Sequence, residues 1–163
     1  MHKMKLTDSP YPKKTEQRAN KALQLIHSDI YGPFKTPTMG SKIYFLTFID
    51  DCSRFTYVYL LSNKNEFLTK LKEYLAITKN KFGRTVRKLR SDNAGEYLRT
   101  ETQNYLERRI QHQLSVAYCF PQNGVSEREN RSRVEMTRRM LSKAKVHPKF
   151  WGGTGKHSST SAE

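Results

Sequence analysis

Three acidic residues lie in separate polar stretches, where each could serve as a metal ligand. Asp29 lies in HSDIYGP (27–33), Asp92 in KLRSDNAGEY (88–97), and Glu127 in PQNGVSERENR (121–131). Carboxylate oxygens are the ligands that Mg²⁺ and Mn²⁺ prefer. Two such ions roughly 3.5–4 Å apart stabilise the attacking and leaving oxygens of an in-line phosphoryl displacement. If folding brings the three acids together, we expect Asp29 to bridge the ions and Glu127 to complete the shell of one.

Other carboxylates compete for these roles. Asp50, Asp51 and Glu96 lie in predicted turns, and Glu129 follows Glu127 by two residues. At about 100° per residue, Glu129 points about 200° away from Glu127 on a helix. Each acid taken singly is also explained by a turn or by a helix N-terminus, where the dipole favours negative charge.

The elements that must position these acids follow from hydrophobic periodicity. A near-continuous apolar run at 42–49 is typical of a buried strand, and residues 64–82 repeat apolar side chains at steps of three and four, as a helix does. The predicted strands span 23–30, 42–49, 55–61, 86–90 and 113–118, and the predicted helices 64–82, 101–109 and 124–146. This order predicts a mixed five-stranded α/β sheet of three antiparallel strands followed by αβ units, with helices on its faces. Asp29 and Asp92 end strands that can be neighbours in such a sheet.

Length and composition limit the alternatives. The 163 residues suggest one domain at 22–151, between a basic, poorly ordered leader at 1–21 and a disordered tail from Gly152. No apolar run approaches the ~20 residues of a membrane helix, so no membrane partner is expected. Cys52 and Cys119 indicate reduced thiols in an intracellular protein. The five histidines lack metal-ligand spacing, so zinc is not expected.

The net charge of +15, from 30 basic and 15 acidic residues, favours nucleic acid as partner. On the last predicted helix Glu127, Asn130, Arg131 and Val134 share one face. The stripe expected to be buried on this helix consists of Val134, Met136, Met140, Leu141 and Ala144. The residues expected to contact DNA are Asn123, Arg128, Asn130, Arg131 and Arg138. A solvated helix face explains each arginine beyond Arg131 equally well.

Four segments occur in an order that resembles a known family. HSDIYGP, FIDDCSRFTYVYLL, LRSDNAGEY and QNGVSERENR, followed by a basic helix ending in KFWG, closely resemble the integrase catalytic core of copia-type retrotransposons over roughly residues 23–152. The resemblance implies a ribonuclease-H-like fold and an Asp-Asp-Glu triad of Asp29, Asp92 and Glu127 that binds Mg²⁺ or Mn²⁺. It further implies insertion of element cDNA into host DNA in the nucleus, and self-association of the protein.

The chain also departs from the pattern of that family. From Asp92 to Glu127 there are 127 − 92 = 35 positions, about one fewer than usual, and the missing residue falls near Arg109, where the family has a helix-ending glycine. Three functions therefore stay open. They are a metal-dependent polynucleotidyl transferase, a DNA-binding remnant in which Glu127 is misplaced, and a nuclease of the same fold that uses water as the nucleophile.

Overall fold

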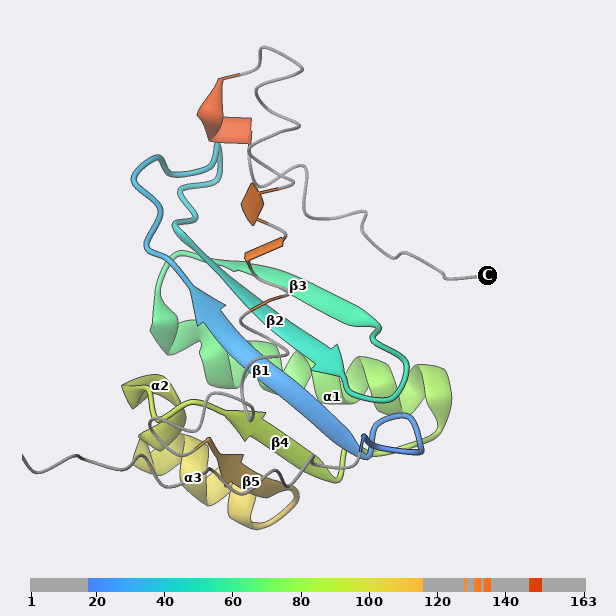
Figure 1. Ribbon diagram of the computed structural model, residues 1–163. Helices are drawn as coiled ribbons and strands as arrows, with labels where there is room; N and C mark the ends of the chain where they lie inside the picture. The colour runs from blue at the N-terminus through green and yellow to red at the C-terminus, as the bar shows by residue number, and fades with distance from the viewer. Residues whose placement is uncertain (1–17, 116–127, 129–130, 133, 136–146, 151–163) are drawn as a thin grey trace, which may run out of the picture.

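The chain folds around one five-stranded sheet with the strand order β3-β2-β1-β4-β5 (Figure 1). The computed structural model describes residues 18–115, 128, 131–132, 134–135 and 147–150. The strands are β1 (Leu25–Tyr31), β2 (Tyr44–Asp50), β3 (Thr56–Leu61), β4 (Lys88–Ser91) and β5 (Gln111–Leu114). β1 pairs with β2, and β2 with β3, in antiparallel fashion, whereas β4 is parallel to both β1 and β5. The predicted mixed sheet is confirmed.

The helix that crosses from β3 to β4 follows the sequence prediction closely. A 3₁₀ turn, η1 (Lys64–Glu66), precedes α1 (Phe67–Phe82). Asn63 and Glu66 form a capping box that satisfies amide groups at the start of this segment. Gly83 ends α1 in the left-handed conformation with φ 63°, which glycine adopts without steric penalty. The crossover returns the chain to the sheet so that β4 pairs with β1 in parallel, as the predicted topology requires.

The prediction for the fifth strand was wrong in its position. Residues 113–118 were expected, but β5 begins two residues earlier and spans Gln111–Leu114, while residues 116–118 lie outside the described part of the chain. The reason is the tight end of α3 (Thr100–Glu107), where the amide of Ile110 donates to the carbonyl of Leu106 at 2.7 Å. The next amide, of Gln111, already donates to Arg87 beside β4 at 2.9 Å. The sequence analysis also missed α2 (Gly95–Leu98), a single helical turn where only a turn was expected.

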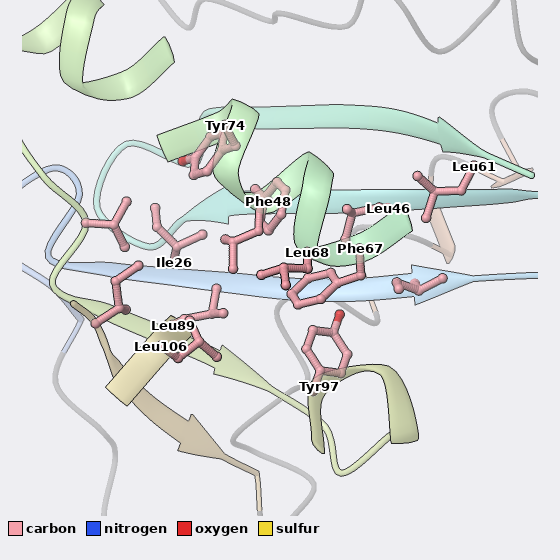
Figure 2. Packing of buried hydrophobic residues seen from close by; sticks show 14 of the residues in the cluster. Ile26, Leu46, Phe48, Leu61, Phe67, Leu68, Tyr74, Leu89, Tyr97 and Leu106 are labelled. Carbon is pink, nitrogen blue, oxygen red and sulfur yellow. The ribbon is translucent and has the colours of Figure 1, made fainter. Parts of the chain in front are cut away.

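One face of the sheet packs against α1, α2 and α3 and forms the main core. The ring of Phe48 on β2 is fully buried and stacks on Tyr74 of α1 at 4.5 Å between centroids. Phe67 at the start of α1 meets Tyr97 of α2 edge-on, also at 4.5 Å. Figure 2 shows these rings together with Ile26 and other aliphatic side chains from β1, β4 and α3. The core therefore joins the antiparallel and parallel halves of the sheet.

The other face of the sheet carries a second, smaller cluster. Phe45 is buried there with Val134, and Phe34 stacks on Phe45 at 5.8 Å. Val134 belongs to the helical positions described between 128 and 135, so the prediction that Val134 is buried is confirmed. The other residues of the predicted stripe lie outside the described residues: Met136, Met140, Leu141 and Ala144. None of the described helices is both long and apolar enough to cross a membrane.

Candidate functional site

Asp29 on β1 and Asp92, the residue after β4, lie toward the same edge of the sheet. The pairing of β1 with β4 sets His27 opposite Arg90, an offset of 90 − 27 = 63 positions. Asp29 and Asp92 are separated by the same offset, 92 − 29 = 63. Neighbouring strands are about 4.8 Å apart, so this register directs both half-buried residues toward the same edge of the sheet. The carboxyl ends of parallel strands form the edge where open α/β sheets bind ligands.

A buried hydrogen bond on the opposite side of the sheet joins β1 to α2, the helix that follows Asp92. Ser28 immediately precedes Asp29, and its hydroxyl lies 3.0 Å from the hydroxyl of Tyr97. Tyr97 belongs to α2, which begins three residues after Asp92, and both hydroxyl-bearing residues are fully buried. The main chain at Asp92 is held as well, because its Oδ1 accepts the amide of Ala94 at 3.1 Å. Together, these hydrogen bonds hold the backbone at Asp29 and at Asp92 in place.

The pKa of the Tyr97 hydroxyl is raised mainly by burial. Burial raises the pKa of the Tyr97 hydroxyl well above its usual value of 10.0, and the negative charges of Asp29, Asp92 and Glu96 raise it further. Charges influence a hydroxyl in this way only at short range or through a medium of low dielectric constant. The hydrogen bond to Ser28 lowers this pKa, so burial is the main cause of the shift.

Removing the Tyr97 hydroxyl tests how much this bond contributes. In Tyr97→Phe the Ser28 hydroxyl loses its partner in a buried position, so we expect the unfolding free energy to fall by about 1–3 kcal/mol. Urea denaturation followed by circular dichroism measures the change. The double variant Ser28→Ala/Tyr97→Phe removes both polar groups and should lose less than the sum of the two single variants. Additive losses would contradict a direct bond.

The competing acids Asp50 and Asp51 have structural roles. Asp50 accepts hydrogen bonds from the amides of Leu23 and Ser53, each at 2.9 Å, and so closes the β2–β3 turn. Asp51 accepts the amide of Ala19 at 2.7 Å and lies 3.0 Å from Nε2 of His27. These contacts lie near the amino end of β1, away from the edge that carries Asp29. A structural role in this turn therefore explains both residues better than metal binding does.

Glu96 is also engaged, through an ion pair in which its own carboxylate is largely buried. Its Oε1 lies 3.1 Å from Nζ of Lys64, and the Glu96 side chain is 8% exposed. The pair joins α2, which follows Asp92, to the segment that begins the crossover helix. A charge buried to this extent needs its partner, so Lys64 and Glu96 serve to hold α2 in place. The sequence offered no signal for this pairing, because the two residues lie 32 positions apart.

His27 lies on the same face of β1 as Asp29, two residues before it. The residue is 1% exposed, and its Nδ1 has no hydrogen-bond partner among the described residues. Burial lowers the pKa of His27 below its usual 6.5, although the bond to Asp51 opposes this effect. Burial also lowers the pKa of His112, whose Nε2 lies 2.9 Å from the Ser91 hydroxyl.

These histidines predict loss of stability in mild acid. Because each pKa is lower in the folded state, the unfolded chain binds protons more readily once the pH falls below the usual value of 6.5. Stability is full above that pH and declines as the pH falls toward the folded-state pKa, by up to about 1.4 kcal/mol per pH unit for His27. The pKa of Asp51 is also lowered, but this contribution is lost only below its usual 3.8.

Urea midpoints measured between about pH 7.5 and about pH 5 test this expectation. The variant His27→Gln should show a weaker dependence on pH than the wild type. The exposed His147 provides a matched control, and His147→Gln should leave the dependence unchanged. An equal slope in wild type and His27→Gln would contradict the assignment.

The remaining predicted site residues are only partly described. Arg128 and Arg131 are exposed. The other candidates lie outside the described residues: Glu127, Asn123, Asn130 and Arg138. Within the described ranges no three histidine, cysteine or carboxylate side chains are grouped as a metal site. The described part of the site is therefore the pair Asp29 and Asp92.

Comparison with known proteins gives the family. The integrase core domain matches residues 19–123, which include both aspartates, and this is more than half of the chain. The chain belongs to the integrase core domain family. Members of this family bind DNA and typically use divalent metal ions. The resemblance inferred from the four sequence segments is thus confirmed.

The relatives with similar sequences are polyproteins of retrotransposons. The chain is 40% identical over 139 residues to the retrovirus-related Pol polyprotein from transposon TNT 1-94 of Nicotiana tabacum, covering 85% of this chain and 10% of that protein. It is 30% identical over 134 residues to the retrovirus-related Pol polyprotein from transposon RE2 of Arabidopsis thaliana, covering 82% of this chain and 9% of that protein. The integrase core therefore spans about a tenth of the length of these relatives.

A solved structure shows the same fold. The cryoEM structure of the simian T-cell lymphotropic virus intasome in complex with PP2A regulatory subunit B56 gamma matches with a TM-score of 0.67 and 18% identity. The match covers 85% of this chain and 49% of that one. The mixed sheet of this integrase core is thus the ribonuclease-H-like fold that the sequence resemblance implied.

Proposed function

We propose that this integrase core joins DNA ends by metal-dependent strand transfer. In this reaction the 3′-hydroxyl of one DNA attacks a phosphodiester of another, so that one P–O bond forms and one breaks. The observation that supports the proposal is the register of β1 and β4, because Asp29 and Asp92 are separated by the same 63 positions as the paired residues of these strands. Two carboxylates that meet at one site repel each other unless cations lie between them.

The donor set fits Mg²⁺ or Mn²⁺. Asp29 and Asp92 offer hard oxygen ligands, and Glu127 is the proposed third ligand. When bound, divalent ions would polarise the phosphodiester and stabilise the oxygens that attack and leave. The chain's own contribution is to hold the two carboxylates on a rigid backbone, through the Ser28–Tyr97 bond and the turn at Asp92.

Val134 supports the placement of Glu127 on the correct side of the sheet. Val134 packs on Phe45, which pairs with Tyr31 across β1 and β2, and Tyr31 shares a face of β1 with Asp29. Residues seven apart lie on nearly the same side of a helix, so Glu127 would share the side of Val134. We therefore propose that the helix brings Glu127 to the face that carries Asp29.

The short spacing between Asp92 and Glu127 favours the alternative of a DNA-binding remnant without catalysis. The geometry near Arg109 weighs against this alternative. The cap residue Arg108 is in the ordinary right-handed conformation with φ −79°, so no glycine is needed to end α3. After α3, β5 still pairs with β4 over four residues, so the sheet is complete up to Leu114 despite the shorter spacing.

A strand-transfer assay tests the proposal with the full chain. The protein is incubated with preprocessed duplex ends and a supercoiled target in Mg²⁺ or Mn²⁺, and joined DNA is measured. Joined products above the level with EDTA are expected. Nicked target without joined DNA would instead indicate the nuclease, and DNA binding without either product would indicate the remnant.

Two further proposals follow from the same function. We propose that the protein self-associates, because two element ends must be joined to one target. We also propose that it acts in the nucleus, where host DNA is found. Sedimentation of the chain with paired DNA ends tests the first, and imaging of a tagged full polyprotein tests the second.

A further inference from the structure

A basic surface lies at the edge of the sheet opposite Asp29 and Asp92. Three connections reach this edge: the segment before β1, the segment between α1 and β4, and the loop between α3 and β5. They lie side by side, because Arg87 donates its amide to Leu23 at 3.1 Å and accepts the amide of Gln111 at 2.9 Å. Since β1, β4 and β5 are parallel, all three begin at this edge and run toward the aspartates (Figure 1).

Each connection contributes exposed cationic side chains, which we call the basic edge. Its members are Lys21, Arg84, Arg87, Arg108 and Arg109. In the described part of the chain no carboxylate lies within ion-pair distance of any of these five residues. Among the described residues Glu107 lines the hollow beside Arg108 and Arg109, Asp50 lines a neighbouring hollow with Arg84, and Arg109 also lies over the ring of Tyr105. The acids of the nearby β2–β3 turn, Asp50 and Asp51, are buried and already hydrogen-bonded.

The basic edge is hollowed in two places. A hollow of about 640 Å³ lies among Lys21, Arg84 and Arg87, and one of about 580 Å³ lies beside Arg108 and Arg109. Four of the five cations are arginines, whose planar groups bind phosphate through two parallel hydrogen bonds. Three neighbouring strands span about 10 Å, a length over which duplex DNA carries roughly six phosphate charges.

We propose that the basic edge binds the phosphate backbone of a second DNA duplex, separate from the DNA at the aspartate edge. β1 runs between the two edges, and from Leu25 to Asp29 a strand advances about 13 Å. The edges face opposite directions, so one straight duplex does not reach both. The contacts are to phosphate alone, which makes this binding independent of sequence. It requires only the fold and the charges, so it stands apart from the proposed catalysis.

The experiment measures the salt dependence of DNA binding by the full chain. A fluorescent duplex of arbitrary sequence is titrated in EDTA over a range of salt concentrations, and the slope of log affinity against log salt is determined. The magnitude of this slope decreases by about 0.9 for each phosphate that the protein no longer neutralises. We expect Arg84→Gln/Arg87→Gln to reduce it by about 1.8, and Arg108→Gln/Arg109→Gln, on the same surface, to do likewise.

The control removes a charge from another surface. Lys70→Gln neutralises a lysine of α1 that pairs with Glu73. The control should leave the slope near that of the wild type, and circular dichroism verifies that each variant folds. If neither arginine variant lowers the slope, or if the control lowers it equally, the basic edge is not a DNA site. Strand transfer is measured in a separate assay. If the protein does not join DNA but the arginine variants still lower the salt slope, only the proposed catalysis is overturned.

Discussion

Substituting Asp92 by asparagine is expected to reduce strand transfer by about a thousandfold while leaving the fold intact. The amide lacks the negative charge that a divalent ion requires, and a metal contributes several kcal/mol to such a reaction, with about 1.4 kcal/mol per factor of ten. The asparagine Oδ1 still accepts the amide of Ala94, so the turn after β4 is preserved. The amount of joined DNA, measured with preprocessed ends, gives the ratio of the strand-transfer rates of the wild type and Asp92→Asn.

Glu101→Gln is the matched control for this substitution. Glu101 is exposed in the first turn of α3, and its change removes one carboxylate charge outside the proposed site. We expect the control to join DNA within about twofold of the wild type, since surface changes are usually neutral. Full activity of Asp92→Asn would show that Asp92 binds no essential metal. An equal fall in the Glu101 variant would show that total charge, and not the site, is responsible.

Replacing Phe48 by alanine is expected to lower the free energy of unfolding by about 3–5 kcal/mol. Phe48 is fully buried between the sheet and α1, where it stacks on Tyr74 and lies 6.3 Å from Phe67 (Figure 2). The truncation leaves a cavity that rigid strands on one side cannot fill. Since domains are stable by about 5–15 kcal/mol, a large part of the chain's stability would be lost. Urea denaturation measures the difference.

Phe82→Ala tests whether the effect depends on burial. Phe82 ends α1 and is 48% exposed, with Lys81 lying over its ring. Its truncation leaves no closed cavity, so we expect a loss below about 1 kcal/mol. Similar losses for the two phenylalanines would contradict the assignment of Phe48 to the centre of the core.

The sequence predicted the elements well where local patterns are strong. The steps of three and four that end at Phe82 predicted the crossover helix, and Gly83 marked its end. The position of β5 was wrong because the pattern of QHQLSVAY fits a strand in more than one register. Hydrogen bonding of Gln111 to Arg87 decides among them, and that bond joins segments 24 residues apart (111 − 87 = 24). Local periodicity carries no information on such a pairing.

The competing acids show the same limit. Asp50, Asp51 and Glu96 resemble Asp29 and Asp92 in the sequence, since all lie near turns. Only the folded chain shows that Asp50 accepts the amide of Leu23, that Asp51 meets His27, and that Glu96 meets Lys64. These partners are 24 to 32 positions away, so their roles depend on tertiary contacts.

The sequence by itself determined the family, the mixed sheet and the identity of the candidate ligands, because motif order and hydrophobic periodicity are properties of residues near one another in the chain. The tertiary structure alone decided that Asp29 and Asp92 share one edge, that Tyr97 lies against Ser28, and that a basic edge forms at the opposite end. These features depend on the register of strands far apart in sequence. That register is set by packing and backbone hydrogen bonds over the whole sheet.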